Sequence, residues 1–443
     1  MQYRKILSKL SEVYLLLFAT IHLLYLGFDG YTKIFNAKIL TFSVINGIYF
    51  TGILITFLAL YLSFDNFDLR SDFKKLLHPS RLFALIYLAF TVLSAFGSRY
   101  FPLTLNGVSR FEGLLTISIY VFSFIAVSFF GCRKKYLLYA FAISVTLFGI
   151  LSVIQIMGLN PLSLYPVGTN FYGAGIDYPT AFIGTIGNTN LSGAFISLVL
   201  PFLAVIMIKA ESKKKWFLLI PVMLLSVTAL KMDVTSTLLG LTAGITVALP
   251  LLFKFNKRKA AIYFAVLVLL LILLVVLLYI FDLGGFFGEV HSILHGEISE
   301  KFGSGRIRIW KDVLSEIPEH LFFGKGPDTM KKSDFPAFEK YYPSLDRVIT
   351  RSIDVAHNEP LNILFHQGIF ALIFYTGFII STLTVWFRNR DDYVILALGI
   401  GFISYLVQSL FTFSMCLTAP YFWICAGLII GLSDISIEKP TLG

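Results

Sequence analysis

The sequence is poor in charge and in cysteine. Only 14% of its 443 residues are charged, and it holds three cysteines. An ordinary soluble domain has about one-quarter charged residues, so the composition excludes that class. Three cysteines are too few for a framework of disulfides. Tandem repeats and low-complexity tracts are also lacking, which excludes a repeat architecture.

Hydrophobic residues are abundant instead: they make up 57% of the chain, and the mean hydropathy is +0.80. Apolar runs of about 18 to 25 residues recur from end to end, each long enough to cross a bilayer core of ~30 Å as a helix. The sequence therefore predicts an all-α polytopic membrane protein with about twelve transmembrane helices. The predicted spans lie near 11–28, 39–62, 81–97, 113–131, 136–157, 191–210, 216–230, 235–253, 260–281, 361–387, 393–414 and 415–432.

The spans divide the chain into three regions. Residues 1–281 form an N-terminal membrane region of about nine spans, and residues 361–443 form a C-terminal membrane region of about three. Between them, residues 282–360 form one large, partly helical extracytoplasmic loop. Because a loop of this length exceeds what a connection needs, we expect it to be functional.

The basic residues indicate the orientation, because short cytoplasmic loops of membrane proteins carry an excess of lysine and arginine. If the N-terminus is cytoplasmic, 21 of the 36 basic residues fall on the cytoplasmic side and five on the short outer loops. This alternation places both termini inside and 282–360 outside. The net charge of +10 thus reports orientation, and we expect no nucleic-acid partner.

Within the loop, the spacing predicts a helix over about 304–317. Arg306, Trp310, Val313 and Ile317 share one of its faces, so Arg306 faces inward beside an apolar stripe. Arg308 lies on the opposite face, toward water. An inward arginine either pairs with a carboxylate of the loop or binds a ligand, and the sequence leaves both interpretations open.

The tenth predicted span begins within "RSIDVAHNEPLNILFHQGI" (351–369). Asn358 is a suitable N-cap, and Glu359 and Pro360 suit a first helical turn, so His357 lies at the outer mouth of the span. A lone histidine at such a place is more often a hydrogen-bonded structural residue. Together with Arg306 and an anion-favouring helix N-terminus, however, His357 suits attack on a phosphorylated substrate.

Three stretches together resemble one known family. "SGRIRIWKDVLSEIPEHLFFGKGPDTM" (304–330) and "AHNEPLNILFHQGIFALIF" (356–374) are similar to the signature loop of the bacterial O-antigen ligase and O-antigen polymerase family, which has an Arg before a Trp, a glycine turn, then His-Asn opening a span. "AFIGTIGNTNLSGAFISLVLPF" (181–202) resembles the family's Gly-Thr-x-Gly-Asn segment at the start of a span. Their order and spacing make the resemblance specific.

The resemblance implies glycosyl transfer on the outer side of the bacterial cytoplasmic membrane. A glycan would pass from an undecaprenyl-diphosphate carrier to an acceptor sugar hydroxyl with inversion, and without a metal or other cofactor. Arg306 matches the family's arginine and His357 its catalytic histidine. The implied partners are the lipid-linked oligosaccharide donor, the glycan acceptor, membrane lipids, a chain-length regulator and a flippase.

The residues leave three functions open. We expect polymerisation of surface-polysaccharide repeat units; the alternatives are a ligase that joins lipid-linked polysaccharide to a final acceptor and, from another class, a flippase or transporter of lipid-linked glycans. Span centres nearly free of charge argue against a transporter.

Other site candidates are weaker. The family commonly has a further arginine after its seventh span, where this chain reads "KMDVTSTLLGLTAG" (231–244); Lys231 either supplies that charge or snorkels at the membrane surface. His366 replaces a frequent acid of the family, and its helix face predicts a packing role away from the site. The remaining substrate-binding candidates are Arg308, Asn358, Asn188 and Asn190, and capping of a helix is the simpler role for the last two.

Overall fold

The computed structural model describes residues 2–27, 33–62, 75–164, 184–232, 234–300, 302–335, 338–342 and 347–438. These residues are almost entirely helical, with one antiparallel β-hairpin. The helices are α1 (Gln2–Leu17), continued by a π-helical turn (Phe18–His22), α2 (Ile34–Leu62), α4 (Pro79–Gly97), α5 (Leu114–Phe130), α6 (Lys135–Ile156), α7 (Thr189–Lys209), α8 (Leu219–Lys231), α9 (Thr235–Leu252), α10 (Lys257–Ile280), α11 (Gly285–Leu294), α12 (Phe302–His320), α13 (Glu359–Arg388), α14 (Tyr393–Ser409) and α15 (Ala419–Glu438). The strands are β1 (Phe338–Tyr342) and β2 (Arg347–Arg351).

Each predicted span overlaps one helix, and most ends agree to within a few residues. The first span, 11–28, agrees least, because α1 begins at Gln2 and the π-helical turn ends at His22. Seven of the described helices are long and apolar enough to cross a membrane: α2, α4, α6, α7, α9, α10 and α13. Three further apolar helices, α5, α14 and α15, are shorter. The chain is therefore a helical, multi-pass membrane protein, while the total of twelve crossings stays a prediction.

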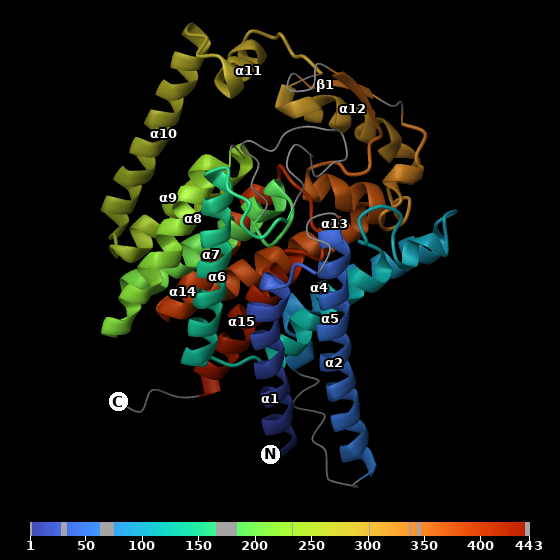
Figure 1. Cartoon of the computed structure of the whole chain (residues 1–443), viewed down its shortest axis with the longest axis vertical. Helices are drawn as coiled ribbons and strands as arrows, with labels where there is room; N and C mark the ends of the chain where they lie inside the picture. Colours follow the sequence, from blue (N-terminus) through green and yellow to red (C-terminus); the bar gives the residue numbers. More distant parts are fainter. Residues whose placement is uncertain are drawn as a thin grey trace.

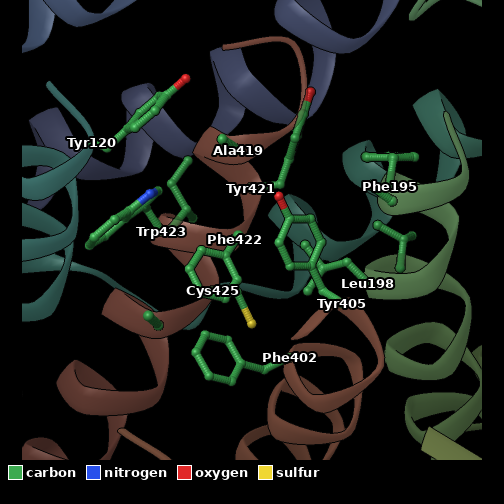
Figure 2. Close-up of a cluster of buried hydrophobic side chains, with 14 of the residues drawn as sticks. Tyr120, Phe195, Leu198, Phe402, Tyr405, Ala419, Tyr421, Phe422, Trp423 and Cys425 are labelled. Atoms are coloured by element: carbon green, nitrogen blue, oxygen red, sulfur yellow. The ribbon is translucent and has the colours of Figure 1, made fainter. Parts of the chain in front are cut away.

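Helix α15 is buried along most of its length and carries part of a hydrophobic cluster, to which α5, α7 and α14 also contribute side chains (Figure 2). The Phe422 ring stacks on Phe402 of α14, with 4.6 Å between the ring centroids, and Trp423 stacks on Phe378 of α13 at 4.8 Å. Each such pair adds about 0.5–1.5 kcal/mol beyond the burial of its area. The cluster thus fixes α13, α14 and α15 relative to one another.

Helix α13 is broken at Gly368, whose backbone has φ = +85°. The loop turn 321–326 crosses the break, and its N–H groups donate to the carbonyls that the break frees. Lys325 N donates to Phe365 O (2.9 Å) and Gly326 N to His366 O (2.9 Å). Gly368 is required here for its conformation and for space, because a Cβ would lie 2.3 Å from Phe322 O. The loop turn 321–326 and Gly368 of α13 are therefore one structural unit.

Helix α10 lies at one edge of the molecule (Figure 1). Leu278 is the one buried side chain among its described residues. α11, α12 and β1 follow at the upper end of the view, opposite the start of α1. The predicted loop is thus a small structured unit that contains helices α11 and α12. It also contains the β1–β2 hairpin, which the prediction of an all-α protein did not include.

Six polar contacts between distant segments each join span ends that the prediction places on the same side of the membrane. Those joining predicted cytoplasmic ends are Arg81–Asp434 (2.7 Å), Arg133–Asp392 (2.7 Å) and Lys209 Nζ to Leu252 O (2.9 Å). Those joining predicted outer ends are Arg110–Asp354 (2.9 Å), Ser414 N to Glu359 Oε2 (2.9 Å) and Gln408 Nε2 to Asn190 O (3.3 Å). None of these six contacts joins a predicted inner end to a predicted outer end.

Candidate functional site

Helix α12 packs against the segment that leads into α13. The indole N–H of Trp310 donates to Ala356 O at 2.8 Å, one residue before His357. Ile309 and Val313 are buried in a small cluster with Met330, Ile353, Ala356 and Phe365. The predicted inward face of this helix is confirmed, but the predicted end at Ile317 is wrong. The helix runs from Phe302 to His320 with Pro318 inside it.

Arg306 lies one turn before Trp310 on this helix and is half-buried. Burial lowers the pKa of its guanidinium, and the negative charge of Glu289 raises it. An arginine stays protonated despite such a shift, so a cation is held in a partly desolvated place. Glu289 also accepts a hydrogen bond from Gly303 N (2.9 Å). If Arg306 has a structural role, it needs a carboxylate of the loop nearby. Glu289 is such a carboxylate.

His357 lies immediately before α13 with φ = +50°, a left-handed conformation that is uncommon for residues with a side chain. Asn358 caps the helix, since its Oδ1 accepts from Leu361 N at 2.9 Å. The imidazole packs edge-on against Phe413, with 5.2 Å between the ring centroids. The predicted cap is confirmed, and His357 stands at the mouth of the helix as predicted.

Arg110 is a residue that the sequence analysis did not select. Its guanidinium lies over the Phe413 ring, 4.6 Å from the centroid, so Arg110 and His357 both contact Phe413. Its Nε and Nη2 both approach Asp354 Oδ2, at 3.0 and 2.9 Å. The available signal was its place among the five basic residues of the short outer loops, where lysine and arginine are scarce.

Asp328 of the glycine turn ties the loop to the segment before α5. Its carboxylate accepts from Ser109 N (3.0 Å), Ser109 Oγ (2.8 Å) and Arg110 N (2.8 Å). Gly107 makes room for it, because a Cβ there would lie 2.3 Å from Asp328 Oδ2. These bonds position the backbone of Arg110 beside the start of α13.

A polar cavity of about 60 Å³ lies among these elements, large enough for water. Glu112 and Glu359 line it with Arg110, Asp328, Asp354 and three tyrosines. Tyr120 Oη donates to Glu112 Oε1 at 2.7 Å. Burial raises the pKa of the Glu112 carboxyl well above its usual range, and the Tyr120 hydrogen bond opposes this.

His366 is buried and packs as predicted, because its Nδ1 donates to Gly326 O (3.0 Å) in the glycine turn. Gln367, the next residue, is also buried, and its Oε1 has no hydrogen-bond partner among the described residues. Both residues line the polar cavity, so His366 lies closer to the site region than its helix face suggested.

The remaining candidates lie elsewhere or have structural contacts. Arg308 is partly exposed and faces Asp312, 3.7 Å away. Lys231 is exposed at the end of α8. Asn188 caps α7 through a bond from Leu191 N (3.1 Å), and Asn190 offers its carbonyl to Gln408. Among the described contacts, none joins these four residues to Arg306 or His357.

The fold and the site define a class: a multi-pass membrane protein with a structured loop, in which the helix that carries Arg306 packs against the segment that places His357 at the start of a broken helix. Residues 221–376, from α8 to the middle of α13, match the family model described as O-antigen ligase. This match assigns that region to the O-antigen ligase and polymerase family and confirms the resemblance. Arg306 and His357 both lie within it, whereas Arg110 and Glu112 lie outside. No curated protein matches the chain.

Proposed function

We propose that this chain transfers a glycan from an undecaprenyl-diphosphate carrier to an acceptor sugar hydroxyl, and that it polymerises surface-polysaccharide repeat units at the outer face of the bacterial cytoplasmic membrane. The hydrogen bond from Trp310 to Ala356 carries the proposal, because it holds the helix of Arg306 against the segment of His357. The family match supports glycan transfer of the ligase and polymerase type. The distribution of basic residues among the short loops supports the outer placement.

The proposed reaction is a single displacement without a metal. The acceptor oxygen forms a bond to the anomeric carbon as the bond from that carbon to the carrier phosphate breaks, which inverts the configuration. His357 takes the proton of the acceptor hydroxyl. Its position before the α13 N-terminus suits this role, because the substrate's anionic diphosphate is favoured at the same helix end.

The leaving lipid diphosphate needs fixed positive charge. Arg306 supplies a guanidinium that its own loop already desolvates in part, and such a cation interacts more strongly with developing negative charge. Arg110, on the other side of the Phe413 contact, is a second cation for the same diphosphate. In this proposal Arg110 supplies the positive charge that an arginine after the seventh span commonly supplies in the family.

The test is glycan length in cells that lack the native gene and carry the His357→Ala variant. We expect polymer to fall at least about 100-fold, the usual contribution of a general base, while unpolymerised lipid-linked units build up in the outer leaflet. Membrane abundance of the variant is measured in the same cells. His295→Ala is the matched control, since His295 is exposed on the same loop and contacts Tyr279 and His291 instead.

Each outcome separates one function from another. Normal polymer in the His357→Ala cells at normal abundance would remove His357 from the mechanism. Full-length polymer that stays on its lipid carrier would favour the ligase, because both reactions use the same donor and differ in acceptor. Accumulation of lipid-linked units in the inner leaflet would instead indicate a flippase.

A further inference from the structure

A second cavity lies at the opposite end of the membrane region from the candidate site. It has a volume of about 220 Å³, and its walls come from α1, α6, α7, α14 and α15. Apolar side chains dominate these walls; Leu198, Tyr421 and Cys425 are three of them (Figure 2). The glycosyl transfer proposed above assigns nothing to this cavity.

The mouth of the cavity has the opposite character. Arg133, Lys134 and Lys135 line it consecutively, at the turn between α5 and α6, and all three are exposed. Arg133 is engaged, because it bonds to Asp392 at 2.7 Å and lies over the Tyr393 ring. Lys134 and Lys135 flank the N-terminus of the 22-residue helix α6, whose dipole adds to their positive potential. An apolar cleft thus ends in a cationic rim.

We propose that this cavity is a binding site for an anionic glycerophospholipid of the inner leaflet. One acyl chain fills the cleft, and the headgroup phosphate binds the ammonium groups of Lys134 and Lys135. Basic pockets between transmembrane helices on the cytoplasmic side bind anionic lipid headgroups in this way. The leaflet follows from the orientation proposed above, whereas binding itself is independent of any glycosyltransferase activity.

The charge at the mouth has a simpler explanation, the general excess of lysine and arginine in cytoplasmic loops. The chain offers a control for it. Lys213 and Lys214 form a second exposed lysine pair on the same predicted side, between α7 and α8, and they do not line the cavity. A site specific to the cavity depends on the first pair and not on the second.

The experiment uses the purified full chain in neutral detergent, with thermal unfolding followed by tryptophan fluorescence. Dioleoyl phosphatidylglycerol is titrated against dioleoyl phosphatidylcholine and against short dihexanoyl phosphatidylglycerol. We expect the long anionic lipid to raise the unfolding midpoint, because a ligand that binds only the folded state stabilises it. The Lys134→Gln/Lys135→Gln variant should bind this lipid at least tenfold more weakly, and the Lys213→Gln/Lys214→Gln variant should bind it like the native protein.

A second readout reports on the cleft itself. Cys132 lines the cavity and is partly exposed, whereas Cys416 and Cys425 are buried. Long-chain phosphatidylglycerol should slow alkylation of Cys132 by maleimide, and dihexanoyl phosphatidylglycerol should not.

Three results would overturn the proposal. Equal stabilisation by the neutral lipid would remove the role of the phosphate, and equal stabilisation by the short lipid would remove the acyl chain from the cleft. If both lysine variants bound the anionic lipid equally weakly, the binding would depend on the general positive charge of the surface and not on the cavity.

Discussion

The ring of Phe413 contacts both His357, the proposed base, and Arg110, the proposed second cation. These two residues are far apart in sequence. A long-range contact of this kind leaves no local pattern, so the sequence predicted His357 and Arg306 through motif spacing and missed Arg110. Cap residues behaved differently. Asn188 and Asn358 were predictable because capping depends only on the next three residues.

Replacing Arg110 by alanine should lower polymer formation at least tenfold, because the substrate diphosphate loses one of its two proposed cations. The complication is Asp354, which the change leaves buried in part without its ion-pair partner. The double variant Arg110→Ala/Asp354→Ala removes that charge as well. If activity returned in the double variant, Arg110 would serve only to neutralise Asp354; we expect activity to stay low.

The Glu112 carboxyl should make stability depend on pH. Because its pKa is raised in the folded state, folding retains a proton there, and stability falls as pH rises above the usual value of 4.5 toward the folded-state pKa. Glu112→Gln keeps an acceptor for Tyr120 and cannot ionise, so we expect a flatter dependence of the unfolding midpoint between about pH 5 and pH 8. Glu297→Gln, at an exposed carboxyl of the loop, is the control. If the unfolding midpoint of the Glu112→Gln variant depended on pH as strongly as that of the native protein, ionisation of Glu112 would not be what destabilises the fold.

At the scale of elements, the hydrophobic runs predicted the helices of the membrane region well, because length and polarity alone decide where a span fits. The end of α12 was harder to predict. Pro318 lacks an N–H to donate within the helix, and the burial of Ile317 beside it offsets that loss, so the helix continues to His320. The polar cavity was also not predictable, because its lining comes from segments on either side of several spans.

The loop turn 321–326 crosses α13 where that helix is broken, and a glycine on each segment, Gly324 and Gly368, allows the close approach. Gly324→Ala and Gly368→Ala place a Cβ 2.4 and 2.3 Å from backbone atoms of the other segment, at positions with positive φ. We expect each change to cost about 2 kcal/mol or more, measured by thermal unfolding in detergent. Gly47→Ala in α2 is the matched control, because a Cβ there meets nothing within 4 Å. Similar midpoints for all three variants would mean that the two segments separate readily.

At the scale of the whole molecule, the orientation can be tested by labelling single cysteines. Lys332→Cys lies in the loop and Lys214→Cys between α7 and α8, both at exposed positions, in a background with the three native cysteines replaced. A membrane-impermeant maleimide should label the Lys332→Cys variant in intact spheroplasts, and the Lys214→Cys variant only after permeabilisation. Labelling of both variants in intact spheroplasts, or the reverse order, would disprove the predicted topology and the proposed leaflets of both sites.

Helix α10, which leads into the loop of Arg306, differs from the other membrane helices in how little of it packs on protein. Its apolar part, residues 260–280, spans about 32 Å, close to a typical hydrocarbon core of ~30 Å, and almost none of its surface packs on protein. Because little protein packing holds this helix, we expect its tilt to respond to lipid thickness. His291 of α11 bonds to Leu278 O, and Glu289 of α11 bonds to Gly303 at the start of the Arg306 helix. We therefore expect membrane thickness to affect the position of Arg306, and the rate of the proposed glycan transfer to vary with the acyl-chain length of the surrounding lipids.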